Sequence, residues 1–564
     1  MGERQRCHRV GHGRPPARSG ARRVAARLHH RRPAPHARGG GTDVRSCRES
    51  LAWDTPGGIG WRYVQQHEPT GDAMSYTSAP HVLVLDSTGL GDRSYVAHDG
   101  VHAIVVDPQR DIDRVEALLA EHGLTLTHVA ETHIHNDYVT GGLELARRHG
   151  ATYVVPGDVD LSYDGLAVRD GDSFTVGDMT VDVIHTPGHT PHHVSFAVRK
   201  DDHLGAVFTG GSLLYGSVGR PDLVAPDLAV KQAHDQWHSA HRLAERLEDE
   251  TPIYPTHGFG SFCAATQAQG LSSTIGNEKN INPAFTDAEE QFVEAILAGL
   301  DVFPAYYAHM GPANAAGPSD VDLTIPEQAD PTVLRERIMR GEWVVDLRSR
   351  EVFAAGHVPG ALNFDLDGAF INYLAWMMPW GTPVTLLGST PEQVQAAHRE
   401  LVRVGIDNAV GQATGGPDFW LEDPAAAQRM EQVDFHGVAA AVAADPSAYL
   451  MDTRQILEWE GGHVAGAVFM PFYEVLDRLD EIPRDKPVYV YCGSGYRAAA
   501  VASLLQHEGF TNIVHVNDDF PNAAGAGLEI VAEAAPEREP GWTWIASRST
   551  VREYSPRTAA DTKG

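Results

Sequence analysis

The chain has little cysteine and no long apolar run. Only four of its 564 residues are cysteine, and Cys7 and Cys47 lie in an unusual N-terminal leader. A disulfide framework is therefore not expected. No run of about 18 apolar residues occurs, and the N-terminus lacks the apolar centre of a secretory signal. These absences predict a cytoplasmic protein with no membrane partner.

Positive charge is also scarce. There are 45 Lys and Arg residues against 75 Asp and Glu residues, which gives a formal net charge of -30. Nucleic acids and anionic membranes are polyanions, so neither is expected as the main partner. Small molecules or proteins fit better, and the sequence leaves open a homo-oligomer. At about 150 residues per domain, the length predicts three or four structural units.

The first 73 residues form an atypical leader. They are rich in Arg, Gly, Pro and His, contain no Lys, and show no helical or strand periodicity in their first half. This composition predicts disorder. Three interpretations stay open: a basic tail, an organelle-type leader, or a translation start placed too early. The last is favoured, because Met74 directly precedes the first strand-like pattern.

A mixed α/β domain is predicted over residues 76–310, where strand-like runs alternate with turns and amphipathic stretches. The strand-like runs are 81–85, 102–107, 126–131, 153–155, 173–176, 180–185 and 206–209, and the amphipathic stretches are 112–121 and 142–148. A Pro-, Ala- and Gly-rich stretch at 311–329 is typical of a linker. We call residues 76–310 the histidine-bearing domain.

An internal repeat follows the linker. Asp346-Leu347-Arg348 precedes a Gly-His-Val-Pro-Gly-Ala segment, and Asp452-Thr453-Arg454 precedes Gly-His-Val-Ala-Gly-Ala. The offset from Asp to His is eleven in both copies, from 346 to 357 and from 452 to 463. Shared order at shared spacing indicates duplication. We predict a first module at 330–428, a second module at 432–546 and a polar tail at 547–564.

The second module contains a candidate nucleophile, Cys492. An apolar strand, Val488–Tyr491, leads into Cys492 and is followed by an Ala-rich helix, Ala498–Gln506. Converging backbone N–H groups, the helix dipole and Arg497 would favour the thiolate and would hold a persulfide or an anionic sulfur donor. The alternative is an inert buried cysteine in a turn. The substrate-binding candidates are the loop residues Gly493, Ser494, Gly495 and Tyr496.

Both modules resemble the rhodanese family, whose members carry the Asp-x-Arg and Gly-His-x-x-Gly-Ala motifs and a Cys-x-x-x-x-Arg loop. The resemblance implies a doubly wound α/β fold, sulfur transfer through a Cys492 persulfide, and thiosulfate, sulfite and low-molecular-weight thiols as partners. The first module has Gly388 in place of Cys492 and Gln393 in place of Arg497. It is therefore expected to be an inactive spacer or docking module.

Histidines follow several strand-like runs of the histidine-bearing domain. In an extended loop, His133-x-His135 points two imidazoles to one side, where both could bind one metal. His189 follows Thr-Pro-Gly, and His257 follows Pro-Thr. Together with Asp137, these residues resemble the metallo-β-lactamase fold family, which implies an αββα sandwich. Tyr138 replaces the last His of that family's His-x-His-x-Asp-His motif.

Within that family the pattern is most similar to the persulfide dioxygenase branch fused to rhodanese modules. The resemblance implies one ferrous ion held by His133, by His189 and by an Asp at the position where this chain has Gly211. Because glycine has no ligating side chain, we expect His133, His135 and His189 to hold one metal, with Asp137 and His257 either behind these ligands or left as the remnant of a second metal site. Iron follows from the resemblance, and imidazole ligation also suits zinc.

These patterns predict an enzyme of sulfide and persulfide metabolism. The metal domain would oxidise a small persulfide, such as glutathione persulfide, to sulfite, and Cys492 would transfer sulfur. Arg220 is a candidate contact for the anionic thiol substrate. Two alternatives stay open: thioester hydrolysis of the glyoxalase II type, and a non-catalytic metal domain that serves the sulfurtransferase as a binding module. Cys263 is expected to be a packed apolar residue.

Overall fold

The fold was analysed in a computed structural model that describes residues 80–536 and 551–557, apart from positions 202, 269, 367 and 368. The expected leader at 1–73 and most of the polar tail lie outside the described residues. In the part of the chain that is described, no helix is long and apolar enough to cross a bilayer.

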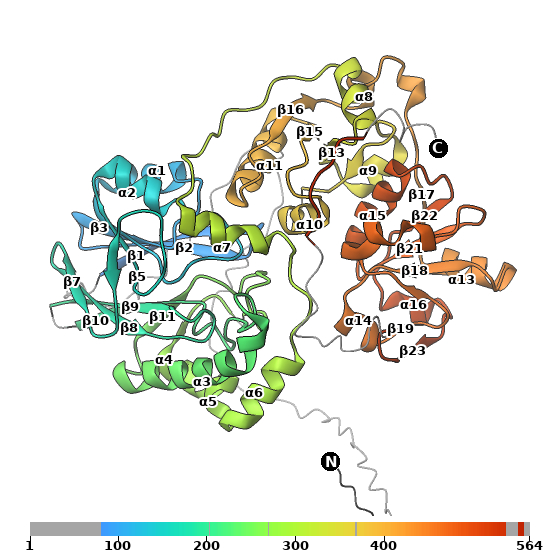
Figure 1. Cartoon of the computed structure of the whole chain (residues 1–564). Helices are drawn as coiled ribbons and strands as arrows, with labels where there is room; N and C mark the ends of the chain where they lie inside the picture. The colour runs from blue at the N-terminus through green and yellow to red at the C-terminus, as the bar shows by residue number, and fades with distance from the viewer. Residues whose placement is uncertain (1–79, 202, 269, 367–368, 537–550, 558–564) are drawn as a thin grey trace, which may run out of the picture. The chain divides into compact units, whose positions relative to one another are not determined.

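Two six-stranded sheets form the histidine-bearing domain (Figure 1). The first sheet runs in the order β1 to β6: His81–Ser87, Asp92–His98, His102–Val106, Thr125–Ala130, Thr152–Pro156 and Leu166–Val168. The second runs in the order β7 to β12: Ser173–Val176, Met179–His185, Val194–Lys200, His203–Gly210, Pro252–Pro255 and Ser273–Thr274. A core that includes Tyr95, Phe196 and Phe208 joins residues of both sheets.

Helices complete the sandwich. α2 (Gly142–His149) packs on β4 and β5, and α1 (Asp113–His122) shares a core with strands of the first sheet. On the second sheet, α3 (Ala229–Arg246) supplies Ala233, Ala240 and Leu243 to a common core. The remaining elements are η1 (Pro226–Leu228), α4 (Ile275–Ile281), α5 (Pro283–Thr286) and α6 (Glu289–Ala298). The predicted αββα arrangement is confirmed.

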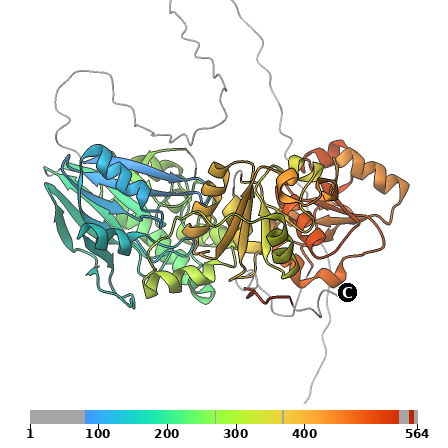
Figure 2. The same cartoon turned by 90° about the horizontal axis from the view of Figure 1, so that it is seen from above.

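Each of the two modules is built on a parallel sheet with helices around it (Figure 2). The first module contains α8 (Pro331–Met339), β13 (Trp343–Asp346), α9 (Arg350–Ala355), β14 (Leu362–Asn363), α10 (Phe370–Met377), β15 (Val384–Gly388), α11 (Pro391–Arg403), β16 (Ala409–Thr414), α12 (Pro417–Trp420) and η2 (Pro424–Ala426). Its strand order is β14-β13-β15-β16, with every pair parallel.

The second module repeats this plan with one more strand in its main sheet and with a separate two-stranded sheet, β19-β23. It contains β17 (Glu431–Val433), α13 (Phe435–Ala444), β18 (Tyr449–Asp452), α14 (Ile456–Glu460), β19 (His463–Val464), β20 (Val468–Phe469), η3 (Phe472–Asp477), η4 (Leu479–Glu481), β21 (Val488–Tyr491), α15 (Tyr496–His507), β22 (Ile513–Val516), α16 (Asn522–Gly525) and β23 (Ile530–Val531). The main sheet has the order β17-β22-β21-β18-β20 and is parallel. Two α/β modules are therefore confirmed.

The repeated Asp-x-Arg motif forms the same buried interaction in both modules. Arg348 donates to both carboxylate oxygens of Asp346 and to the carbonyl of Gly356, at 2.5–3.1 Å. Arg454 does the same with Asp452 and Gly462, at 2.7–3.1 Å. A bidentate, charge-assisted pair is strong and geometrically specific. The motif therefore has a structural role, tying the end of the first central strand to the Gly-His turn.

The stretch expected to be a linker begins with a buried helix. α7 (Tyr307–Ala316) occupies its first part and accommodates Pro312 near its middle. Asn314 is buried, accepts the Thr140 N–H, and donates to the carbonyls of His135 and Tyr138, all at 2.9 Å. These bonds and the burial of Met310 fix the helix against the histidine-bearing domain, so the stretch predicted to be a linker includes ordered structure.

We predict that Asn314→Ala destabilises the histidine-bearing domain by roughly 2–4 kcal/mol, since one N–H and two carbonyl groups lose buried partners. Calorimetry should show the domain's unfolding transition lowered by roughly 5–10 °C. Asn280→Ala, at an exposed position on α4, is the matched control and should change the transition little. An equal effect of both substitutions would contradict the role assigned to Asn314.

Candidate functional site

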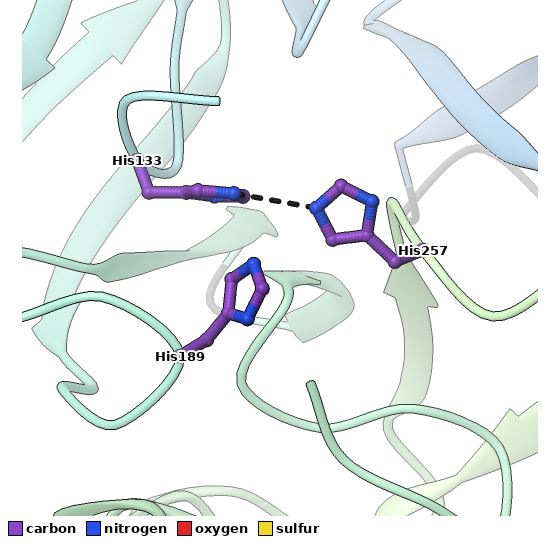
Figure 3. A group of neighbouring side chains, drawn as sticks. All are labelled: His133, His189 and His257. Carbon is purple, nitrogen blue, oxygen red and sulfur yellow. Dashed lines mark hydrogen bonds between the residues drawn. The ribbon is translucent and has the colours of Figure 1, made fainter. Parts of the chain in front are cut away.

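The candidate metal centre is built from three loops that follow strands (Figure 3). His133 follows β4, His189 follows β8, and His257 follows β11. The three imidazoles are at most 1% exposed and point toward one another. Strands from both sheets thus deliver side chains to one point.

One nitrogen of each ring faces the other two. The three ligand atoms of His133, His189 and His257 all lie within 4.8 Å of one another. The Nε2 atoms of His133 and His257 are 3.3 Å apart. Among the described residues, Nε2 of His189 has no hydrogen-bond partner although it is buried. A buried, unpartnered lone pair beside two more imidazoles fits a metal ion.

The other nitrogen of each ring, Nδ1, is hydrogen-bonded to a group of the surrounding protein. His133 Nδ1 lies 2.9 Å from Thr132 Oγ1, whose hydroxyl donates to Asp107. His189 Nδ1 lies 2.9 Å from the Arg220 carbonyl, and His257 Nδ1 lies 2.9 Å from Asp92 Oδ1. A carbonyl or carboxylate can only accept, so it fixes a proton on Nδ1 and frees Nε2 for a metal.

The electrostatic environment differs among the three rings. Burial, together with the neighbouring His257, lowers the pKa of His189 to about 3. Burial and surrounding imidazoles likewise lower the pKa of His133 well below its usual range. At His257 burial acts in the same direction, but Asp137 and Asp92 outweigh it and raise the pKa to about 10. His133 and His189 are therefore neutral donors, and two carboxylates support His257.

His135 departs from its expected place. Its Nε2 contacts Glu131 and Asp107 at 3.2 Å and the Tyr138 hydroxyl at 3.0 Å. It groups with Asp107 and Glu131, or with Asp137 and His257, rather than with His133 and His189. His257, rather than His135, groups with His133 and His189 in this structure, while Nδ1 of His135 is buried without a hydrogen-bond partner. The expected trio of His133, His135 and His189 therefore stays a prediction. Asp137 lies behind His257, 3.2 Å from Nδ1, as expected.

Arg220 is not positioned to receive a substrate. It is 5% exposed and donates twice to Asp222 at 2.8 Å and once to the Asp301 carbonyl at 2.6 Å. With these acceptors the guanidinium is paired within the protein in this structure, and the predicted substrate contact stays a prediction. Its backbone carbonyl orients His189 instead.

The cysteine loop connects β21 to α15. Cys492 is 1% exposed, and the Gly495 N–H donates to its sulfur at 3.2 Å. Gly495 adopts the left-handed conformation, with φ 87°, which lets the loop turn directly into the helix. The carbonyls of Gly493 and Ser494 accept bonds from the Phe520 N–H and Arg350, and Tyr496 donates to the Asp365 carbonyl at 2.6 Å. The loop therefore has the N–H donor that an anionic sulfur needs.

Arg497 faces a carboxylate rather than the sulfur. Its two terminal nitrogens donate to Glu458 at 2.5 and 2.7 Å. Burial lowers the pKa of Arg497, but the bonds to Glu458 and the nearby Cys492 outweigh it, so the net shift is upward. A Cβ at Gly493 would lie 3.0 Å from this guanidinium. Glycine at that position therefore leaves room for the Arg497–Glu458 pair.

The first module cannot host the same loop. Gln393 accepts the Ser389 N–H and donates to the Leu347 carbonyl, at 2.7 and 2.8 Å. A Cβ added at Gly388 would lie 2.9 Å from Val394 and 3.2 Å from the Thr390 carbonyl. The loop is thus filled by its own side chains, which agrees with the expectation of an inactive module.

Several residues around the sites were not identified from the sequence. His193 is fully buried, stacks on His133 and accepts the Gly211 N–H at 3.0 Å. Asp92, whose carboxylate contacts His257, is the first residue of β2. That strand begins with polar residues, which interrupt the apolar alternation expected of a strand. Glu458 was visible only as the third residue after Gln455, the spacing of a helix capping box.

The comparisons with known proteins separate the chain into two parts. The family model described as "Rhodanese-like domain" matches residues 330–423 and 436–523. Persulfide dioxygenase ETHE1, mitochondrial, of Homo sapiens is 30% identical over 239 residues, which are 42% of this chain and 80% of that protein. Hydroxyacylglutathione hydrolase of Rhizobium johnstonii is 36% identical over 193 residues, 30% of this chain and 71% of that protein.

A solved structure matches a longer part of the chain. The metallo-beta-lactamase from Staphylococcus aureus subsp. aureus COL is 29% identical, with a TM-score of 0.55, and the match covers 60% of this chain and 99% of that one. The chain belongs to the metallo-β-lactamase-fold family and carries two rhodanese-like domains. Both parts point to sulfur metabolism.

The two described cysteines should differ in reactivity toward iodoacetamide. Cys263 is fully buried beside Asp137, and burial raises its pKa well above the usual range. Because the thiolate is the reactive form, we predict that Cys263 is alkylated at least about tenfold more slowly than Cys492 in the native protein.

Peptide mass spectrometry over a time course would measure both rates. In urea the two cysteines should be alkylated at similar rates. That result would show that the difference in the native protein comes from the fold and not from the local sequence around each cysteine. Equal labelling of both cysteines in the native protein would contradict the assignment.

Proposed function

We propose that the chain oxidises a low-molecular-weight persulfide of the glutathione persulfide type to sulfite and transfers sulfur through Cys492. The observation that carries the proposal is the presence, in one chain, of an inward-facing histidine cluster and a cysteine loop with an N–H aimed at the sulfur. The similarity to persulfide dioxygenase ETHE1 supports the first half, and the rhodanese-like domains support the second.

The histidine cluster would hold one divalent metal, with Fe(II) favoured and Zn(II) the alternative. When bound, a ferrous ion would supply the redox chemistry that O₂ requires, which zinc does not. The chain's own residues keep His133 and His189 neutral by burial and fix the ring orientations through their Nδ1 atoms. The overall reaction consumes persulfide, O₂ and water and yields thiol and sulfite: RSSH + O₂ + H₂O → RSH + H₂SO₃.

Cys492 would carry the sulfane sulfur. Its thiolate attacks the outer sulfur of thiosulfate, sulfite leaves with the electron pair, and a Cys492 persulfide forms. A small thiol then takes that sulfur and regenerates the thiolate. The Gly495 N–H, held by the start of α15, stabilises negative charge on the sulfur in both steps. Arg497 is held by Glu458 and adds positive charge near the loop.

Thioester hydrolysis is the second candidate, because the relative from Rhizobium johnstonii is named hydroxyacylglutathione hydrolase. Tyr138 counts against a second metal for that chemistry. Its hydroxyl contacts His135 and the Asp107 carbonyl, at 3.0 and 3.2 Å, and is buried among them. A metal domain that only binds its ligand is the third candidate.

Two variants of the full chain should separate the activities. Cys492→Ser should lose thiosulfate:cyanide sulfur transfer by more than about 1,000-fold while consuming O₂ with glutathione persulfide, because it lacks only the transferring thiol. His133→Ala should lose O₂ uptake and keep sulfur transfer. An oxygen electrode and a thiocyanate assay measure the two rates, with bound metal determined in parallel.

His203→Ala, at an exposed position, is the control and should keep both activities. Thioester hydrolysis without O₂ uptake would favour the hydrolase. Sulfur transfer with neither bound metal nor O₂ uptake would favour the binding module.

A further inference from the structure

We propose that His257 is the third metal ligand, in an all-imidazole site formed by Nε2 of His133, His189 and His257, and that Asp92 supplies charge from behind His257. This inference deepens the metal-dependent half of the proposed function. From the sequence, His257 is expected to lie behind the metal ligands, and the proposal makes it a ligand.

The hydrogen bonds at Nδ1 settle which nitrogen of each ring is free. The Arg220 carbonyl and the Asp92 carboxylate are acceptors, so they take the Nδ1 protons of His189 and His257. The Thr132 hydroxyl gives its own proton to Asp107 and therefore accepts from His133 Nδ1. The three Nε2 atoms consequently face one volume, and the ligand atoms of the three rings lie within 4.8 Å of one another. Nε2 of His133 and Nε2 of His257 share a hydrogen bond of 3.3 Å, and a metal ion would displace the proton of that bond.

A carboxylate at position 211 does not fit this arrangement. A Cβ at Gly211 would lie 2.2 Å from Cδ2 and 2.6 Å from Cγ of the His189 ring. The ring cannot turn away freely, because the Arg220 carbonyl holds its Nδ1. The Gly211 N–H is also bound to His193. Glycine at position 211 therefore leaves room for the ring of His189. In the proposed site, His257, which follows β11, replaces the carboxylate ligand that position 211 cannot supply.

His135 is the competing third ligand. Its Nε2 is occupied by contacts with Glu131, Asp107 and Tyr138. Its Nδ1 is buried without a hydrogen-bond partner, but His135 groups with Asp137 and His257 rather than with His133 and His189. A hydrogen-bonded carboxylate behind a ligand imidazole raises the basicity of that ligand. Asp92 is the carboxylate behind His257. Its negative charge would act on the metal through the His257 ring and would partly replace the carboxylate that is missing at position 211.

The ligand set is uncharged, which bears on the substrate class. With three imidazole ligands and the Asp92 carboxylate only behind one of them, a divalent metal would keep more of its charge than with a directly bound aspartate. Such a centre favours an anionic ligand in its open position. Where the proposed function holds, that ligand is the deprotonated outer sulfur of the persulfide.

Cobalt(II) binding to the full chain tests the ligand assignment without any turnover. Competition with a chromophoric chelator gives the affinity. We expect His257→Gln to weaken binding by more than about 100-fold, Asp92→Asn by roughly 10–100-fold, and His135→Gln by less than about tenfold. The wild-type Co(II) protein should also show three exchangeable, paramagnetically shifted imidazole N–H signals in its proton NMR spectrum, one of which disappears in His257→Gln.

Circular dichroism would establish that each variant is folded, and the NMR count on the unsubstituted protein needs no variant. Loss of affinity in His135→Gln equal to that in His257→Gln would overturn the assignment. Tighter binding in Gly211→Asp, or no Co(II) binding by the wild type, would do so as well. Metal binding as described without O₂ uptake would reject the proposed reaction and leave the ligand assignment intact.

Discussion

The metal centre of the histidine-bearing domain depends on the hydrogen bonds that orient its buried imidazoles through their Nδ1 atoms. His133, His189 and His257 arrive from three loops, and each ring is oriented by an acceptor at Nδ1. Two of these acceptors, Asp107 through Thr132 and Asp92, come from the first sheet, whereas two of the rings come from the second. The packing of the two sheets therefore sets the spacing of the Nε2 atoms.

The duplicated modules share a fold but differ at the position of the cysteine loop. Both modules retain the Asp–Arg fork and its bond to the Gly-His turn, because that interaction ties together strand and turn. The loop after β15 differs in its side chains from the loop after β21. Gln393 fills the first with backbone hydrogen bonds, whereas Gly495 leaves an N–H for Cys492 in the second. Fold stability and sulfur chemistry thus depend on different residues.

The sequence was sufficient where the signal is local. Alternating apolar residues predicted β1 and β3, and the repeat predicted both modules. β2 was missed because Asp92, Arg93 and Ser94 break the alternation, although all seven of its residues are buried. The role of His257 was missed for a related reason. Its partner Asp92 is 165 residues away, and no local pattern indicates that a polar strand end will reach it.

The Cys492 loop and the histidine cluster would each have to attract an anionic substrate to a negatively charged protein, and the groups available for this differ between them. The chain carries a formal net charge of -30, yet its proposed substrates are anions. Long-range repulsion is screened beyond about 10 Å at 0.1 M salt, so short-range groups decide binding. At Cys492 these are the Gly495 N–H and the start of α15, which attract negative charge without a free cation. Arg497 is paired with Glu458, so its contribution is partly neutralised. At the histidine cluster the attraction would come from a metal held by imidazole ligands, so in the proposed function both centres would select sulfur anions at contact distance.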